Sequence, residues 1–229
     1  DRECPDFFPL VDESGEERWV FWGANGLYRI GRFDGTTFTP ETPVLTCENG
    51  RNGYAAQTWS NVPDGRTLQI SWMAGGLFPE MPFNQQLSIP VELTLTGSGS
   101  DVALARNPVR ELTSLRTRSI IEPDQTLKRG GSIRPDTKCP LLDVSFVVQP
   151  GDAEALHAVI RGQLARFDWK KRELTFTKPG NKVMGDGGTV PLPTTDQIAV
   201  QMIIDKTSME VFINDGQTSA SFCYLPDGH

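Results

Sequence analysis

The chain has 229 residues, of which 38% are hydrophobic and 22% are charged, and this balance is typical of a folded globular protein rather than a disordered one. The formal net charge of −7 argues against a nucleic-acid partner, because binding to phosphates requires clustered lysine and arginine. No stretch approaches the roughly 18 to 20 consecutive apolar residues of a membrane span, so no membrane partner is expected either.

The cysteines and histidines do not have the spacing of a metal or redox site. The four cysteines are widely separated, no Cys-x-x-Cys pair occurs, and the chain has only two histidines. We therefore expect no metal site and no cofactor. A chain of this length does not need a disulfide to fold, so we expect free thiols that are mostly buried.

Dipeptides typical of tight turns divide the chain into short segments. Asn-Gly and Asp-Gly tolerate the positive φ that hairpin turns require. Six of these dipeptides, which we take as tight turns, begin at Asn25, Asp34, Asn49, Asp64, Asp186 and Asp215. The segments between them are rich in aromatic and β-branched residues, so the sequence predicts an all-β protein.

Strands are predicted where aromatic and β-branched residues gather. The predicted strands are 19–22, 28–31, 68–72, 142–148, 198–204 and 209–213. In the first of them Trp19, Phe21 and Trp22 surround Val20, so apolar side chains do not alternate with polar ones. That pattern predicts a strand buried on both faces.

One helical turn is predicted, at residues 107–116, with Pro108 near its start and two leucines three residues apart. The preceding stretch, residues 96–100, reads Thr-Gly-Ser-Gly-Ser. This composition fits a linker and the tip of a hairpin equally well.

At the start of the chain, residues 2–10 read Arg-Glu-Cys-Pro-Asp-Phe-Phe-Pro-Leu. This stretch resembles the general-acid segment of glycoside hydrolase family 32, the β-fructosidases that include invertases, levanases and inulinases. Four further segments match the same family in the same order, at 54–59, 69–73, 82–95 and 208–216. Such a series of ordered matches makes coincidence an unsatisfactory explanation.

The resemblance implies a fold of two parts. Residues 1–107 would be the last blades of a five-bladed β-propeller, and residues 108–229 a β-sandwich, with the boundary near residue 110. It also implies that the earlier blades and the last strands of the sandwich are missing from this chain.

The resemblance assigns Glu3 the role of general acid and base, which protonates the glycosidic oxygen and later deprotonates the attacking water. An arbitrary glutamate near a chain end would be a solvated surface charge. The adjoining Cys-Pro-Asp and the downstream matches favour the catalytic role here. We expect Glu3 to be buried beside aromatic and apolar groups, which would keep it protonated near neutral pH.

Four further residues are assigned to the substrate site by the same resemblance. Trp72 would stack on the fructose ring, with an ordinary core tryptophan as the equal alternative. Tyr54 and Gln57 would lie near Glu3 and tune it through hydrogen bonds, with strand residues bonded to backbone as the alternative. Cys4, inside the acid motif, is the fourth.

Three other acidic residues look structural. Asp6 is expected to hold the shape of its loop through backbone hydrogen bonds. Glu92 lies in a β-rich run and Glu111 on the predicted helical turn.

In the family, the nucleophile lies in an Asn-Asp-Pro segment and a further aspartate in an Arg-Asp-Pro segment, and neither tripeptide occurs in this chain. Retaining glycosidases need two carboxylates about 5 Å apart. We therefore expect a retaining hydrolase of levan, inulin or sucrose-like fructosides that is inactive without the missing blades, supplied in cis or in trans. The alternatives are a non-catalytic carbohydrate-binding module and a subunit of a split fructosidase. A secreted or periplasmic location is expected because family members that degrade fructans are often exported.

Overall fold

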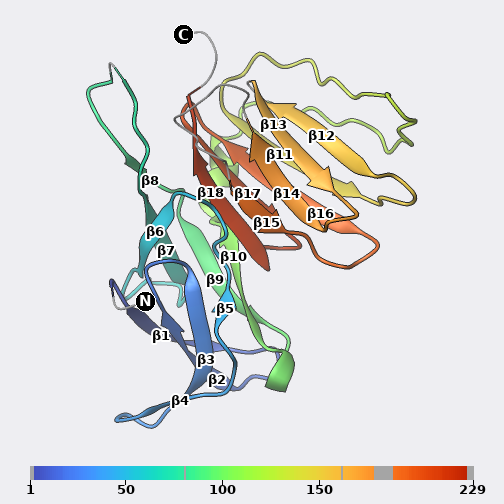
Figure 1. Ribbon diagram of the computed structural model, residues 1–229. Helices are drawn as coiled ribbons and strands as arrows, with labels where there is room; N and C mark the ends of the chain where they lie inside the picture. Colours follow the sequence, from blue (N-terminus) through green and yellow to red (C-terminus); the bar gives the residue numbers. More distant parts are fainter. Residues whose placement is uncertain (1–2, 80, 161, 178–187, 226–229) are drawn as a thin grey trace.

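The computed structural model describes residues 3–79, 81–160, 162–177 and 188–225. Within these ranges the chain is built from antiparallel strands in four sheets, which confirms the all-β prediction. Two sheets come from the first half of the chain and two from the second half, and the halves lie side by side (Figure 1). No helix of the described residues has the length and apolar character needed to cross a membrane.

The first half holds ten strands in two sheets. The first sheet has the order β1-β2-β3-β4, with β5 also paired to β3: β1 Asp6–Val11, β2 Glu17–Trp22, β3 Leu27–Phe33, β4 Phe38–Pro40 and β5 Leu45–Thr46. The second has the order β10-β9-β7-β6, with β8 also paired to β7: β6 Gly53–Thr58, β7 Thr67–Met73, β8 Gln86–Leu87, β9 Val91–Thr96 and β10 Ala103–Pro108.

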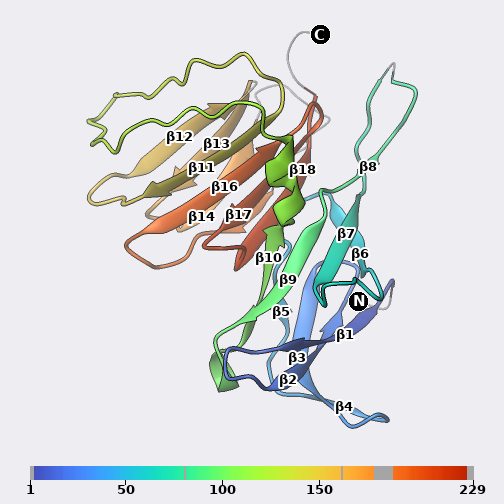
Figure 2. The same cartoon turned by 180° about the vertical axis from the view of Figure 1, so that it is seen from behind.

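The second half holds two four-stranded sheets, which are seen from both sides in Figures 1 and 2. One has the order β11-β16-β17-β18: β11 Leu142–Val148, β16 Ile198–Ile204, β17 Ser208–Ile213 and β18 Thr218–Cys223. The other runs in chain order: β12 Ala155–Ile160, β13 Gln163–Asp168, β14 Glu173–Thr177 and β15 Thr189–Pro191. Short 3₁₀ helices lie at Gly99–Asp101 (η1) and Arg110–Leu115 (η2).

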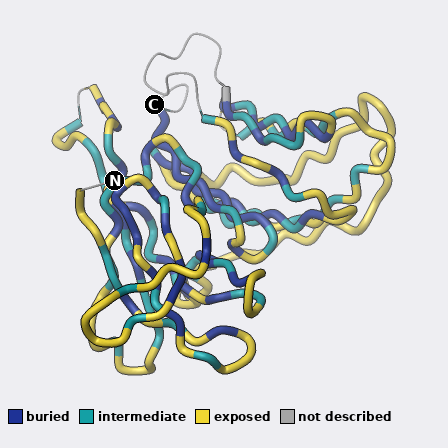
Figure 3. Tube along the Cα trace, turned by 60° about the horizontal axis from the view of Figure 1, so that its bottom comes forward, coloured by how far each residue is buried: buried dark blue, intermediate teal, exposed yellow. Residues whose placement is uncertain are grey.

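The apolar core is divided in the same way as the sheets. One cluster joins side chains of β13 and β14 to those of β16, β17 and β18, so the two sheets of the second half share a core. A second cluster joins the two sheets of the first half and includes Phe212 of β17. The buried stretches in Figure 3 follow these strands, while the connecting loops are largely exposed. The contact made by Phe212 shows that the two halves pack against each other.

Most of the local predictions are confirmed. All six predicted strands lie within observed strands, and the turns at Asn25, Asp34, Asp64 and Asp215 connect paired neighbours. Asn49 lies between β5 and β6, which belong to different sheets, so it does not form a hairpin. The turn predicted at Asp186 lies outside the described residues.

The region around residues 96–116 combines a hairpin with a short helix. Thr96 of β9 pairs with Ala103 of β10, so the Gly-Ser stretch is a hairpin tip rather than a linker. The predicted helical turn appears as η2, and Pro108 ends β10 instead of starting the helix. Arg66 pairs with Glu92 at 3.4 Å and with Glu111 at 2.5 Å, in keeping with the structural role expected for both glutamates.

Strand β2 corrects the prediction of burial on both faces. Val20 and Trp22 are buried, at 0% and 1% exposure, whereas Phe21 between them is 43% exposed. The apolar residues of the second face contact other aromatic rings, since the centroids of the Phe7 and Trp19 rings lie 4.6 Å apart and Phe33 contacts both. The strand therefore alternates in burial although it does not alternate in polarity.

The cysteines are free, as expected, but only half of them are buried. Cys47 and Cys223 are buried, and Cys4 and Cys139 are exposed. Burial raises the pKa of both buried thiols to about 12. These two thiols are therefore neutral throughout the physiological pH range.

The turn between β17 and β18 fits tightly against the first half. Gly216 has a φ of +78°, and a Cβ at this position would lie 2.1 Å from the carbonyl oxygen of Arg106. Gly35, at φ +94°, has nothing within 4 Å of its hypothetical Cβ. The two glycines share the left-handed conformation and differ in the space around them.

Gly216→Ala is expected to lower the free energy of unfolding by about 3 kcal/mol or more, because backbone strain and overlap add together. Gly35→Ala should lower the free energy of unfolding only by the cost of placing alanine in the left-handed conformation, about 1–2 kcal/mol. Chemical denaturation of both variants measures the difference. Equal losses would mean that the turn moves away from β10 without penalty.

Candidate active site

Glu3 lies in the loop just before β1, beside β6 of the neighbouring sheet. The hydroxyl of Tyr54 donates a hydrogen bond to Oε2 of Glu3 at 2.5 Å. The backbone N–H of Ala24 donates to the Glu3 carbonyl at 3.3 Å. Glu3 itself is exposed, so the expectation of burial was wrong.

A β-bulge brings Tyr54 and Gln57 to the same side of β6. Tyr54 pairs with Trp72 and Gln57 with Ile70, so two residues of β6 face one residue of β7. Ala55, inside the bulge, has a φ of +49°. In a regular strand, side chains three residues apart point to opposite faces. The extra residue of the bulge brings Tyr54 and Gln57 back to the same face. Nε2 of Gln57 can therefore donate to the Cys4 carbonyl at 3.1 Å while Tyr54 reaches Glu3.

Asp6 fixes the other end of the acid loop. Its Oδ2 accepts a hydrogen bond from the backbone N–H of Thr58 at 2.7 Å, and its Oδ1 accepts one from the N–H of Phe7 at 3.0 Å. The expectation that Asp6 holds its loop through backbone hydrogen bonds is confirmed. Its pairing with Thr58 was not foreseen, although Thr58 lies inside the matched segment 54–59.

Cys4 contributes its backbone rather than its thiol to these contacts. The residue is exposed and adopts a φ of +43°, which turns the chain between Glu3 and Pro5. Its carbonyl is the acceptor for Gln57. Cys4 is thus placed beside the candidate acid, in a conformation that few residues other than glycine adopt readily.

Trp72 lies next to Tyr54 and is open to solvent. The two ring centroids are 6.2 Å apart at an interplanar angle of 70°. Trp72 is 40% exposed, so it is not part of an apolar core. Leu87 of β8, its cross-strand partner on the other side, is 61% exposed. Across the sheet from β6, next to the candidate acid, lie the exposed aromatic side chain of Trp72 on β7 and then the exposed aliphatic side chain of Leu87 on β8.

The electrostatics of Tyr54 are set by Glu3. The hydrogen bond to the Glu3 carboxylate, together with partial burial and the negative charge, raises the pKa of the phenol above its ordinary value. Tyr54 consequently remains a hydrogen-bond donor at neutral pH. A donor held at this distance orients the carboxyl group, as a general acid requires.

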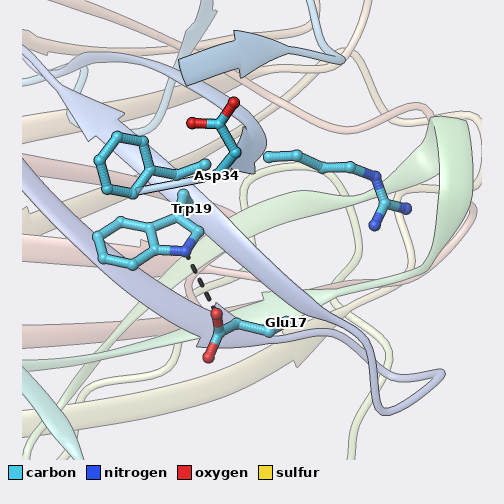
Figure 4. A pocket seen from close by; sticks show the side chains of 5 residues that line it. Glu17, Trp19 and Asp34 are labelled. Atoms are coloured by element: carbon cyan, nitrogen blue, oxygen red, sulfur yellow. Dashed lines mark hydrogen bonds between the residues drawn. The ribbon is translucent and has the colours of Figure 1, made fainter. Parts of the chain in front are cut away.

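Two cavities of the described residues lie away from Glu3. One, of about 350 Å³, opens on the first sheet between Glu17, Trp19 and Asp34, where Nε1 of Trp19 donates to Glu17 at 3.3 Å (Figure 4). Another, of about 290 Å³, lies between β10 and the β11-β16-β17 face, beside Asn107 and Phe146. Glu3, which is exposed, lines neither of these two cavities.

No group of three or more His, Cys, Asp or Glu side chains suited to hold a metal ion occurs among the described residues. The chemistry that this surface can supply is proton transfer by Glu3, hydrogen bonding by Tyr54 and Gln57, and aromatic contact by Trp72.

Comparison with known families gives one domain match. The model described as "Glycosyl hydrolases family 32 N-terminal domain" matches residues 2–108. This range contains all five candidate site residues: Glu3, Cys4, Tyr54, Gln57 and Trp72.

Curated relatives align with nearly the whole chain. A levanase from Bacillus subtilis is 31% identical, over 98% of this chain and 39% of the levanase. A sucrose-6-phosphate hydrolase from Zymomonas mobilis is 27% identical, over 96% of this chain and 46% of that enzyme. The chain therefore spans less than half the length of these two relatives.

A solved structure shows the same fold. The exo-inulinase from Aspergillus awamori superposes with a TM-score of 0.85 at 23% sequence identity, over 98% of this chain and 52% of the exo-inulinase. The arrangement of the four sheets is thus shared across both halves of the chain.

Proposed function

Because the chain belongs to glycosyl hydrolase family 32, we propose that it is the acid-bearing part of a β-fructosidase that hydrolyses levan, inulin or sucrose-like fructosides with retention of configuration. The observation that carries this proposal is the Glu3 loop. The carboxyl group of Glu3 accepts a hydrogen bond from Tyr54, and the loop is tied to β6 through the Cys4 carbonyl. The relatives named as levanase and sucrose-6-phosphate hydrolase support the substrate class.

Glu3 donates its proton to the glycosidic oxygen as the bond to the anomeric carbon breaks, and then takes a proton from the water that releases fructose. Tyr54 orients the carboxyl group, and Gln57 holds the backbone of the acid loop. Trp72 offers its exposed face to a sugar ring, whose C–H groups pack on aromatic surfaces. The exposed Glu3 becomes enclosed only when the nucleophile-bearing blades and the substrate cover it.

The two sheets of residues 1–107 are proposed to be propeller blades, and residues 108–229 a β-sandwich. The shared core of the last two sheets supports the second assignment. The nucleophile is proposed to lie outside this chain, since neither Asn-Asp-Pro nor Arg-Asp-Pro occurs in it. A secreted or periplasmic location is proposed with it, supported by a relative from Aspergillus niger that is named an extracellular exo-inulinase.

Fructose release from sucrose, levan and inulin tests this proposal. Residues 1–229 by themselves should release none above background. The same residues should release fructose when segments that bear Asn-Asp-Pro and Arg-Asp-Pro are supplied in cis or as a second polypeptide. Release of fructose by residues 1–229 alone would refute the proposal that the nucleophile lies outside this chain. Tight binding of levan without release in either preparation would favour a carbohydrate-binding module.

A further inference from the structure

Two carboxylates and a single guanidinium are buried together where the halves of the chain meet. Glu48 follows β5, Arg106 lies on β10 and Glu210 lies on β17, and they are 4%, 1% and 2% exposed. Nη1 of Arg106 pairs directly with Oε2 of Glu48. If both glutamates were ionised, one positive charge would face two negative charges in a region closed to water, which is costly.

The position of Ser221 on β18 indicates that one of the two carboxyl groups is protonated. Its Oγ lies 3.0 Å from Oε2 of Glu48 and 3.4 Å from Oε2 of Glu210. A serine hydroxyl has one hydrogen, so it can donate to only one of these oxygens. The other contact is a hydrogen bond only if that carboxyl group carries a hydrogen of its own. The Arg106 guanidinium pairs directly with Glu48 and not with Glu210, so we assign the hydrogen to the Glu210 carboxyl group.

We propose that Glu210 is protonated at neutral pH and that its proton keeps the junction between the two halves closed, with hydrogen bonds running from Glu210 to Ser221 to Glu48. This inference concerns the junction and does not depend on the chemistry of Glu3.

The junction also holds the segment next to the candidate site. The backbone N–H of Ile89 donates to Oε1 of Glu210 at 2.7 Å, and Oγ1 of Thr207 donates to Oε1 of Gln86 at 2.7 Å. Between these two anchors lies Leu87, the cross-strand partner of Trp72. The second half of the chain thereby positions β8, so opening of the junction should release this strand.

The groups around Glu210 agree with this assignment. Burial, and secondarily the charge of Glu48, raise the pKa of Glu210 to about 8, against the opposing effects of the Ile89 N–H, Arg106 and Ser221. Cys223 faces it from β18 as a neutral thiol, since the pKa of Cys223 is itself raised to about 12. Among the described residues, Glu48 and Arg106 are therefore the charged groups that act on Glu210.

The folded state binds this proton more tightly than the unfolded state, whose glutamate has the ordinary pKa of 4.5. The stabilisation is therefore fully present below pH 4.5 and is lost as the pH rises to about 8. Over this window the folding equilibrium constant should fall by up to about tenfold per pH unit, the limit for one proton.

Glu210→Gln is the matched variant, because its amide retains an acceptor for Ile89 and a donor for Ser221 at every pH. In chemical denaturation of residues 1–229 between pH 5.5 and pH 7, the free energy of unfolding of the native protein should fall with rising pH, and its slope should exceed that of Glu210→Gln by nearly one proton. The surface variant Glu13→Gln should keep the native slope. Parallel slopes for the native protein and Glu210→Gln would overturn the proposal.

Two measurements do not depend on the folding of a variant. The ¹³C resonance of the Glu210 carboxyl group should titrate near pH 8 in the folded protein, and titration near pH 4.5 would refute the assignment. Hydrogen exchange adds a local readout. At pH 8.5 the Ile89 amide should be about tenfold less protected in the native protein than in Glu210→Gln, and equal protection would show that β8 is independent of this proton.

Discussion

Replacing Glu3 with glutamine is expected to slow hydrolysis of sucrose and levan about 10²- to 10⁴-fold in an enzyme that combines this chain with its nucleophile segment. Glutamine keeps the size of the side chain and an acceptor for the Tyr54 hydroxyl, but it has no proton to give to the departing oxygen. The alkoxide leaving group of a sugar is poor without that proton. The loss should therefore appear in kcat/KM for natural substrates.

The leaving group provides the internal control for this variant. A β-fructoside with an acidic phenol as leaving group needs little protonation, so Glu3→Gln should form the fructosyl-enzyme from it at nearly the native rate. Glu13→Gln, on the surface beyond β1, should hydrolyse both substrates at the native rate. Equal slowing for both substrates would indicate a structural defect, and full activity on sucrose would remove Glu3 from the mechanism.

Replacing Arg106 with alanine is expected to lower the free energy of unfolding by about 3–5 kcal/mol, because it leaves the Glu48 carboxylate buried without its counter-ion. The guanidinium also lies 5.5 Å from the centre of the Trp22 ring. Its remaining hydrogen bonds go to Gln69, Ser71 and Ser219. One substitution therefore removes contacts to both sheets of the first half and to β18.

Denaturation measures this effect, and Arg110→Ala is its control. Arg110 is also paired with a carboxylate, Asp64, but its side chain is 68% exposed, so its loss should leave stability nearly unchanged. Combining Arg106→Ala with Glu48→Gln should recover part of the loss, because the unpaired charge is then absent. A loss as small as that of Arg110→Ala would show that water enters the junction.

The local elements of this fold follow from patterns that the sequence displays. Asp-Gly and Asn-Gly turns mark hairpins wherever the flanking strands are neighbours in one sheet, as at Asp34 and Asp64. Asn49 has the same dipeptide between strands of different sheets, and nothing local distinguishes it. Strand β2 shows a second limit: Phe21 is apolar yet exposed, because burial depends on what packs against the face and not on the residue alone.

The residues of the candidate site were predicted through the family resemblance, whereas their geometry was not. Tyr54 and Gln57 are three residues apart, and only the bulge at Ala55 places them on one side. No periodicity in the sequence marks that extra residue. The exposure of Glu3 was missed because burial was inferred from a complete enzyme rather than from the described residues.

The buried junction was not foreseen at all. Glu48, Arg106 and Glu210 are far apart in the sequence and meet only through the packing of three sheets. One signal was present. Glu210 is the one charged residue in a strand whose other members are Ser208 and four apolar side chains, and a charge in such a run needs a partner when it is buried.

Azide rescue of Glu3→Gln tests the central claim most directly, in the enzyme that also carries the nucleophile. With an activated aryl β-fructoside the fructosyl-enzyme should accumulate, because water lacks its general base, whereas azide attacks without one. The account predicts that azide accelerates turnover and yields β-fructosyl azide, with the configuration retained. Absence of rescue, or formation of the α-azide, would contradict the role of Glu3 as the acid and base.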